Sequence, residues 1–290
     1  MLLGFLGGFL VMVALLAQFY APGQLMRTPL DVDSTTHLSG DATVGSEPRG
    51  PVLATSVTRA DSAKSDGDVV VFVNSACLVK DVGSPPNCVS ADDPQKRLLS
   101  ASVDNFATDR KTGQAVNDPK YLPPDATPHR GLVNKWPFDA QKQTYPYWDG
   151  TANAAGNAVY DGETTLQGLK VYKYRAQVPQ TPIDVAAGVK GTYTTDTEIY
   201  VEPRTGAIVN TVQHQERLAD DGSNVLNLDL AFTSSQEKSS VKDAISNKDK
   251  LDLVTKTVPL IGFVVGIPLL IAGIALTLLA NRRESTPRHR

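Results

Sequence analysis

Two apolar runs without a charged side chain stand at the two ends of the chain. The first covers residues 2–20 and the second covers residues 258–280, and neither contains Asp, Glu, Lys or Arg. A helix needs about 20 residues to cross the roughly 30 Å hydrocarbon core of a bilayer. The pattern therefore predicts two transmembrane helices, with residues 1–21 as a first, uncleaved anchor and residues 258–280 as the second.

A cleaved signal peptide is the alternative interpretation of the first apolar run. Such a peptide has a positively charged start and a small-x-small cleavage site after its apolar part. The run begins Met-Leu-Leu-Gly, and no clear site of that kind follows it. We therefore expect the first helix to be retained.

Between the two runs, short segments of alternating apolar and polar residues predominate, which is typical of β-strands with one buried face. In the clearest, Leu226, Leu228, Leu230 and Phe232 alternate with polar or small residues. The segment from Pro203 to Gly206 offers a proline and a glycine at positions where a turn needs them, so it predicts a hairpin. The strands predicted in this way cover residues 52–59, 69–73, 100–108, 168–178, 192–202, 207–217 and 226–232.

The predicted fold is a mainly β domain over residues 28–238, a sandwich or a partly open barrel. Residues 109–117 resemble residues 202–210 in turn chemistry and flanks, since both contain a Thr-Gly pair after a basic residue. Two related β-modules, divided near residues 120–130, would explain this resemblance, and coincidence is the alternative. A weak helical period over residues 239–257 predicts a juxtamembrane helix that leads into the second span.

The charges near the second span indicate the orientation. Residues 281–290 contain four arginines and one glutamate, and basic residues next to a span favour the cytoplasmic side. The tail is thus expected in the cytoplasm, together with the N-terminus, and the β domain is expected outside the inner membrane. The net charge of the whole chain is −3, so the rest of the chain is more acidic than this, which argues against binding to nucleic acid.

Both cysteines, Cys77 and Cys88, lie in a short stretch rich in turn residues. A domain outside the cytoplasm is in an oxidising environment, so we expect a disulfide between them. Two free thiols are the alternative if the domain is cytoplasmic. The nearby chain supplies too few further ligands for a metal site.

Motifs for catalysis are missing from the sequence. The histidines of the domain, His37, His129 and His214, show no metal-binding spacing, and no G-x-S-x-G elbow or phosphate-binding loop is present. We therefore expect a protein that is not an enzyme, with no catalytic residue, cofactor or metal.

The densest group of aromatic residues lies between residues 135 and 149. Each such ring can bury roughly 150–250 Å². One interpretation is a core seam under a sheet; the other is the lip of an apolar groove for a lipid or a partner, with Pro137 and Pro146 preventing regular strand pairing. The candidate binding residues under the second interpretation are Trp136, Phe138, Tyr145, Tyr147 and Trp148.

Glycines in the two apolar runs predict close helix packing. Gly4 and Gly8 form one G-x-x-x-G face, and Gly262 and Gly266 form another. In an antiparallel helix pair, Gly273 reaches the depth of Gly4 and Gly8. This would leave the Gly262 face for another chain, although glycine is also simply frequent in membrane helices.

Three segments resemble a known family: residues 28–36, the block from Trp136 to Asp149, and residues 200–206. They are similar to the actinobacterial membrane family often labelled porin PorA, which includes a mycobacterial polar growth factor. The resemblance runs from helix to helix. It implies a role near trehalose monomycolate transport alongside an RND-type exporter, and it supplies no catalytic residues.

Three functions follow as expectations. The first is a non-enzymatic envelope factor. It binds a lipid, for instance a mycolate glycolipid, or it binds a lipid transporter or another envelope-assembly protein. The second is a structural subunit of a membrane complex that does not bind lipid. The third is the porin of the family label. A pore needs a closed barrel with an apolar outer band or several helices around water, and the polar strands predicted here do not suit it.

Overall fold

The computed structural model describes residues 2–284 of the chain. They form two compact units, one made of the described parts of residues 2–27 and 246–284 and one made of residues 28–245. Most of the predicted basic tail, residues 285–290, lies outside the described residues. The two units are described in turn.

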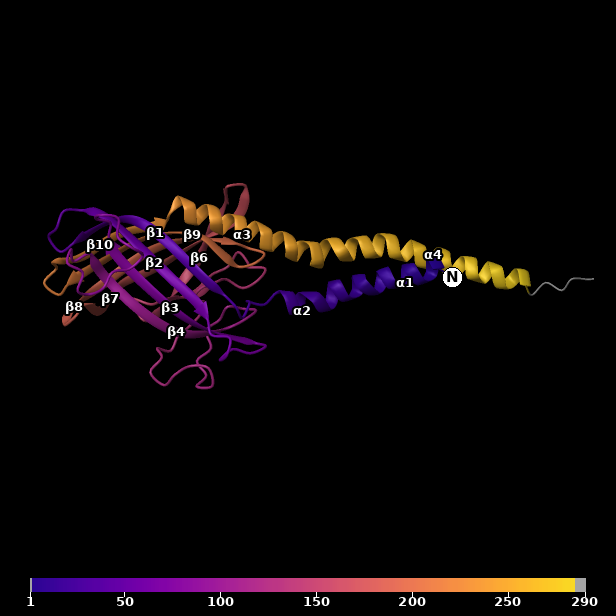
Figure 1. The fold of residues 1–290 in the computed structure, drawn as a ribbon, viewed down its shortest axis with the longest axis horizontal. Coiled ribbons are helices and arrows are strands. Elements are labelled where there is room, and N and C mark those ends of the chain that lie inside the picture. Colours follow the sequence, from indigo (N-terminus) through magenta and orange to yellow (C-terminus); the bar gives the residue numbers. More distant parts are fainter. Residues whose placement is uncertain (1, 285–290) are drawn as a thin grey trace, which may run out of the picture. The chain divides into compact units, whose positions relative to one another are not determined.

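The helical unit contains both predicted spans. The first helix consists of α1 (Leu2–Leu15), a π-helical turn η1 (Leu16–Tyr20) and α2 (Ala21–Leu25). The second begins with α3 (Ser234–Asp252), passes through a π-helical turn η2 (Leu253–Thr257) and continues as α4 (Val258–Glu284) (Figure 1). Both helices are long and apolar enough to cross a membrane, which fits the prediction from the sequence.

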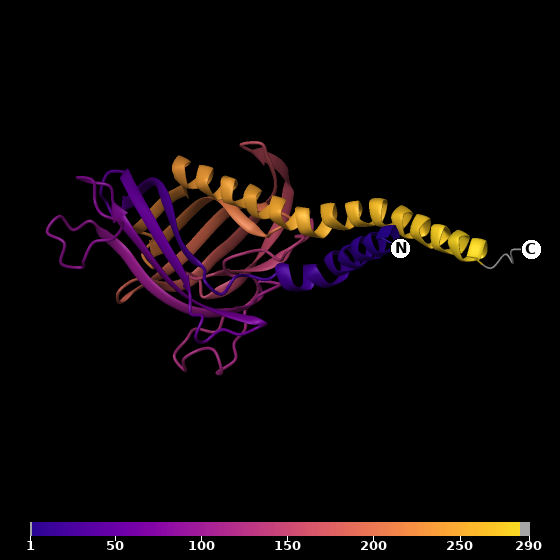
Figure 2. The same cartoon turned by 45° about the vertical axis from the view of Figure 1, so that its right-hand side comes forward.

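The other unit contains a single sheet of ten strands. Each strand pairs antiparallel with its neighbours, in the order β4-β3-β2-β1-β10-β9-β8-β7-β6-β5, and the sheet curls into a half-barrel (Figures 1 and 2). The strands are β1 (Asp33–Val44), β2 (Gly50–Ala60), β3 (Val69–Lys80), β4 (Leu98–Asp109), β5 (Tyr145–Asp149), β6 (Ala154–Leu166), β7 (Leu169–Ala186), β8 (Val189–Glu202), β9 (Ala207–Ala219) and β10 (Asn224–Phe232).

The two faces of the sheet differ in chemistry, because neighbouring residues of a strand point to opposite faces. The inner face carries Leu228, Tyr174 and Ile199, all fully buried. The outer face carries Asp229 and Arg175. One part of the core therefore lies on the inner face of the curled sheet, and another lies on the outer face, where α3 packs.

Short bridges connect the two edge strands at one end of the sheet. Thr108 of β4 pairs with Ala115, Gln114 pairs with Leu132, and Leu132 pairs with Tyr147 of β5. Residues 114–116 and 131–133 thus complete a path of backbone hydrogen bonds between the edges. The partly open barrel is the correct one of the two predicted architectures.

All seven predicted strands are present, and the predicted hairpin joins β8 to β9. At its turn, the carboxylate of Glu202 accepts hydrogen bonds from the amides of Arg204 (3.0 Å) and Thr205 (2.7 Å). Gly206 donates its amide to the Glu202 carbonyl and has a φ of +73°, a conformation open to glycine.

The similar turn after β4 uses the same contacts. One carboxylate oxygen of Asp109 accepts from the amides of Lys111 (2.9 Å) and Thr112 (2.7 Å), and Gly113 closes the turn with a φ of +71°. The local resemblance seen in the sequence is therefore real. Both turns belong to one continuous sheet.

The juxtamembrane helix begins earlier than predicted, at Ser234 directly after β10. The hydroxyl of Thr233 accepts a hydrogen bond from the amide of Gln236 at 3.2 Å, as an N-cap residue does. The first part of α3 then buries Val241 and Ala244 against the outer face of β7 and β9. This contact explains why the helix follows the strand without a linker.

Candidate functional site

The predicted aromatic site lies in the core of the β domain. Trp136 has no exposed surface, and its ring centroid is 5.0 Å from that of Tyr174 and 5.2 Å from that of Tyr147. Tyr145, which is 6% exposed, belongs to the same cluster. Residues 131–140 fold over the inner face of the sheet, and Trp136 fills the space between them.

The second tryptophan belongs to a different group of rings. Trp148 is 8% exposed and lies 4.6 Å from the ring of His129, which in turn lies 5.5 Å from Phe106. The two tryptophans therefore do not line one groove. Of the five candidate residues, Phe138 and Tyr147 are half-buried, and the other three are buried.

The proline argument for an open groove was wrong at Pro146. This residue lies within β5 and pairs with Asn157 of β6. On the other side of β5, the Pro146 carbonyl accepts the amide of Leu132, and the Leu132 carbonyl accepts the amide of Trp148, both at 2.8 Å. The segment is thus paired on both sides. The proline permits this because it lies where the strand needs no amide donor.

Two glycine turns hold residues 135–137 in place. The Trp136 amide donates to the Gly206 carbonyl at 2.9 Å. A Cβ on Gly206 would lie 2.1 Å from the Trp136 carbonyl oxygen, and one on Gly113 would lie 2.9 Å from the Lys135 carbonyl oxygen. Both turns thus allow a close backbone approach that other residues would block.

Several polar atoms of this region have no protein partner in the described part of the chain. They are Asn134 Oδ1, Trp136 Nε1 and Trp148 Nε1. Lys135 lies with its ammonium 3.6 Å from the centre of the Phe138 ring, and burial lowers its pKa to about 7. Sequence reasoning missed this lysine, because an ammonium group is usually solvated.

His129 and Asp104 form the arrangement most similar to a catalytic pair. His129 is buried, and its Nε2 lies 2.8 Å from an Asp104 carboxylate oxygen. Its Nδ1 lies 2.7 Å from the Thr127 carbonyl oxygen. Both ring nitrogens are engaged within the fold, so neither is placed to activate a nucleophile. The described residues contain no group of three His, Cys, Asp or Glu side chains suited to a metal ion.

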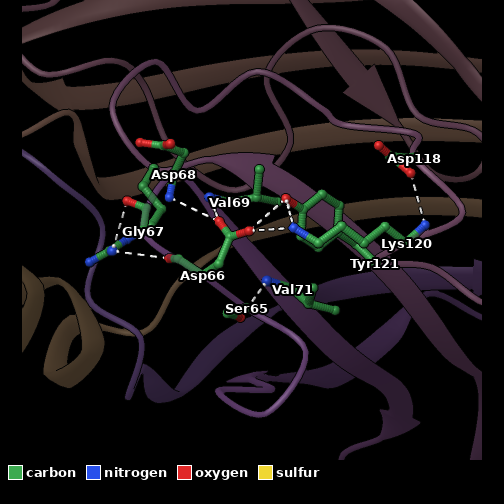
Figure 3. Close-up of polar contacts among 10 residues, drawn as sticks. Ser65, Asp66, Gly67, Asp68, Val69, Val71, Asp118, Lys120 and Tyr121 are labelled. Atoms are coloured by element: carbon green, nitrogen blue, oxygen red, sulfur yellow. Dashed lines mark hydrogen bonds and ion pairs between the residues drawn. The ribbon is translucent and has the colours of Figure 1, made fainter.

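Asp66 is the centre of the polar cluster in Figure 3. Its carboxylate accepts hydrogen bonds from Lys120 Nζ (2.7 Å), from the Tyr121 hydroxyl (2.8 Å) and from the amides of Asp68 and Val69. These bonds, that of Lys120 above all, lower the pKa of Asp66 well below its usual range. Each carboxylate oxygen is saturated by residues of the same domain, so the cluster fixes a loop and offers nothing to a ligand.

The outer face of the sheet has a polar hollow of about 370 Å³. The carboxylate of Asp229 is shared by His214 and Arg49, and Asp196 pairs with Arg175. Further carboxylates, those of Asp41 and Glu198, line the same hollow. A face with this charge does not suit contact with lipid chains.

An apolar groove of about 570 Å³ lies between α1 and α4 in the helical unit. No charged side chain lines it, and its one polar side chain, Thr277, donates its hydroxyl to the Gly273 carbonyl within the helix. The residues of the groove are Gly4, Phe5, Gly8, Phe9, Met12, Leu270, Gly273, Ile274, Thr277 and Leu278.

Glycines bring these two helices together. A Cβ on Gly273 would lie 2.3 Å from the Gly4 nitrogen, which places these two residues in contact as the sequence suggested. The Gly262 face was expected to remain open for another chain. That expectation was wrong, since a Cβ on Gly262 would lie 2.7 Å from Ala14 Cβ, and one on Gly266 would lie 2.9 Å from Leu10 Cβ.

The close contact expected of Gly8 is made by Gly7 instead. A Cβ on Gly8 would meet only Leu270 Cδ1, at 3.8 Å, so Gly8 lines the groove and is not needed for close packing. Gly7, by contrast, would place a Cβ 2.3 Å from the Leu270 nitrogen. The G-x-x-x-G spacing singled out Gly4 and Gly8 and missed Gly7, which pairs with Gly266 on the other helix.

Comparisons with known proteins identify the family of the chain. A family model described as Porin PorA matches residues 1–275. A protein named Porin PorA from Corynebacterium amycolatum is 35% identical over 97 residues, which is 29% of this chain and 25% of that relative. The aligned part thus spans about a quarter of the relative's length. Because the family model covers nearly the whole chain, helices and sheet included, the chain belongs to the Porin PorA family.

Proposed function

We propose that the chain is a non-enzymatic factor of the cell envelope that binds a lipid. Its two apolar helices hold it in the inner membrane, and its β domain lies on the extracytoplasmic side. The observation that carries the proposal is the apolar groove between α1 and α4. Membership of a membrane protein family supports the location.

The groove has the size and chemistry that an acyl chain needs. Its volume of about 570 Å³ falls within the roughly 300–1,000 Å³ that ligand sites usually have. Gly4 and Gly8 contribute no side chain to the groove, and Phe5, Met12 and Leu278 are among the apolar residues that line it. A chain seated there contacts apolar atoms on both helices, each CH₂ group adding dispersion contacts.

The aromatic region of the β domain supports a smaller part of the proposal. Trp136, Tyr145 and Trp148 are buried, so they do not offer an open apolar surface. The unpartnered indole nitrogens of the two tryptophans suit a polar group of a ligand or a bound water molecule. We include in the proposal that the lipid is a mycolate glycolipid and that a lipid transporter delivers it.

A porin is the second candidate, and the name of the relative favours it. The charged outer face around Asp229 and Arg175 argues against insertion of the sheet into a bilayer. Several copies would have to assemble their helices around water, and the helix pair offers Thr277 as the one polar side chain of its groove. Conductance of the purified protein in planar bilayers tests this candidate directly.

Native mass spectrometry of the full-length protein, after thorough detergent exchange, tests the proposal. The Gly8→Leu variant fills the groove without forcing the helices apart, because a Cβ there makes only an ordinary contact. Gly23→Leu is the matched control, since nothing lies within 4 Å of a Cβ on Gly23. We expect bound lipid in the wild type and in Gly23→Leu and a clear loss in Gly8→Leu. Equal lipid in all three proteins would reject the groove as the binding site.

A further inference from the structure

Arg217 lies on the inner face of the curled sheet, in strand β9, and is half-buried. It follows Gln215 by two residues, so both side chains point to the same face. Both residues pair with inward-pointing leucines of β10, Gln215 with Leu228 and Arg217 with Leu226. On its other side Arg217 pairs with the buried Tyr193 of β8. A guanidinium group therefore lies on the apolar side of the sheet and not among the charges of the outer face.

This guanidinium has no acidic partner in the described part of the chain. Its Nε and Nη2 both donate to one atom, Gln215 Oε1, at 3.3 and 3.2 Å, and its carbon lies 6.0 Å from the centre of the Tyr193 ring. A guanidinium has five N–H donors, so most of them are left without an acceptor among the described residues. Burial, opposed in part by Tyr193 and Asp149, lowers the pKa of Arg217.

The carboxylate of Asp149 acts on Arg217 only at longer range, because it is engaged by other groups. One oxygen accepts the Tyr193 hydroxyl at 3.0 Å. The other accepts the amides of Thr151 at 2.9 Å and Ala152 at 2.8 Å, which fixes the turn after β5. Asp149 thus has its own structural role and does not neutralise the arginine.

Most other arginines of the β domain are used differently. Arg110 donates to the carbonyl oxygens of residues 28, 66 and 67. The arginines that pair with an aspartate are Arg49, Arg59, Arg97, Arg175 and Arg204. A half-buried charge without such a partner is unfavourable for the fold, and positions of this kind are characteristic of functional sites.

Gln215 provides a second donor at the same place. It is 6% exposed, and its Oε1 is the atom that accepts from Arg217. Its Nε2 is attached to the same carbon as Oε1, and within the residues that the structure describes this amide nitrogen has no acceptor. Buried polar groups are nearly always hydrogen-bonded, so the amide of Gln215 and the guanidinium of Arg217 together suit an acceptor from outside the chain.

An apolar surface begins next to these donors. Arg217 pairs with Leu226, and Leu226 pairs with Val44 of β1. The buried members of this inner-face cluster are Ala42, Val52, Leu78, Leu226, Leu228 and Leu230. The residues packed against them, Leu38, Val44, Ala54 and Leu99, are only partly buried. The inner face thus has accessible apolar surface beside a cation that lacks an anion.

We propose that Arg217 and Gln215 bind the anionic head group, a carboxylate or a phosphate, of an amphiphile whose apolar chain lies on the inner face beside Leu226 and Val44. The planar guanidinium binds two oxygen atoms of such a group at once, and the Gln215 amide donates to one of them. The site goes beyond the proposed function, because it lies within the β domain and does not depend on the groove between α1 and α4.

Isothermal titration calorimetry of the full-length protein in nanodiscs tests the head-group site, with empty nanodiscs as the blank. The probe is hexyl phosphate, whose short chain keeps it soluble. We expect Arg217→Gln to weaken binding about tenfold or more, because a charge-assisted pair is lost. Arg217→Lys, which keeps the charge without the fork, should lie between this variant and the wild type.

Two further variants are the controls for this titration. Arg59→Gln removes the same charge from an exposed arginine that pairs with Asp33 on the outer face, and it should bind hexyl phosphate like the wild type. Gly8→Leu, which fills the α1–α4 groove, should also leave this binding unchanged. A wild type that does not bind, or an Arg217→Gln variant that binds equally well, would overturn the proposal.

The choice of ligand tests the apolar part of the site. Inorganic phosphate carries the head group without the chain, and 1-hexanol carries the chain without the charge. We expect both to bind more weakly than hexyl phosphate. Equal affinity for inorganic phosphate would overturn the role of the apolar face, and equal affinity for 1-hexanol would overturn the role of the guanidinium.

Thermal melting followed by circular dichroism separates a binding role of Arg217 from a structural one. Arg217→Gln removes a half-buried charge that has no ion pair, so we expect it to melt at a temperature no lower than that of the wild type. A clear decrease would show that the guanidinium supports the fold, and it would overturn the proposal.

Discussion

The backbone of Trp136 lies directly against that of Gly206. The Trp136 amide donates a 2.9 Å hydrogen bond to the Gly206 carbonyl, and the Trp136 carbonyl oxygen occupies the place where a side chain of residue 206 would begin. The hairpin turn between β8 and β9 therefore does more than reverse the chain. It holds the segment that carries the largest buried ring of the domain against the inner face of the sheet.

We expect Gly206→Ala to destabilise the β domain more than Gly222→Ala. Both glycines have a positive φ, which costs an alanine about 1–2 kcal/mol. Only Gly206 would also set a Cβ against the backbone of Trp136, whereas Gly222 has open space around it. Overpacking adds about 1–3 kcal/mol. Chemical unfolding of the two variants measures the difference, and equal losses would contradict the clamping role of the turn.

The aromatic residues lead to a second prediction. Truncation of a buried large ring costs about 3–5 kcal/mol, so Trp136→Ala should unfold at much lower temperature than the wild type. Val103→Ala, at an exposed position, should change the stability by no more than about 0.5 kcal/mol. A Trp136→Ala variant of normal stability would mean that the ring lies at a surface.

The sequence predicted those strands whose residues alternate clearly, and it missed three whose residues do not. Strand β1 is mostly polar, and its apolar inner residues, Leu38, Ala42 and Val44, are interrupted by Gly40. A Cβ on Gly40 would lie 1.8 Å from the backbone oxygen of Asp229 in β10. Where two strands approach this closely, the inner residue must be small, so the sequence shows no regular alternation of apolar and polar residues.

The candidate site could be predicted only in part, for a different reason. The concentration of rings around Trp136 was visible, but a buried ring and an exposed ring have the same sequence. The close pairing of Gly7 with Gly266 depends on the rotation of α1, which a G-x-x-x-G spacing leaves open. The spacing of glycines in the sequence shows which face of a helix can pack closely. Which glycine of that face contacts the other helix is decided by the tertiary structure.

The disulfide was predicted because the β domain is expected outside the cytoplasm. It is confirmed, with a Cα–Cα distance of 5.7 Å between Cys77 and Cys88. It closes the loop that leads from β3 to β4. A closed loop of this length restricts the unfolded chain and stabilises a domain by about 2–3 kcal/mol. We expect the double variant Cys77→Ser/Cys88→Ser to lose about this amount in chemical unfolding. The intact linkage is checked by peptide mass spectrometry without a reductant, and free thiols in the native protein would contradict it.

The lowered pKa of the half-buried Lys135 makes the stability of the β domain depend on pH. Burial lowers the pKa of Lys135 to about 7 in the folded protein, while an unfolded lysine has a pKa of about 10.4. Between these two values the unfolded chain binds more protons than the folded one, so the free energy of unfolding rises with pH from about 7 to about 10. Below pH 7 the amine is charged in both states, so it no longer makes the free energy of unfolding change with pH.

Replacement of this lysine should remove that slope. We expect Lys135→Met to be more stable than the wild type at pH 6 and the difference to disappear as the pH approaches 10, because a neutral amine resembles the methionine that replaces it. Lys111→Met, at an exposed position, is the matched control and should leave the profile unchanged. Urea unfolding at a series of pH values measures both variants. A constant difference between Lys135→Met and the wild type across this range would show that the ammonium of Lys135 is solvated in the folded protein.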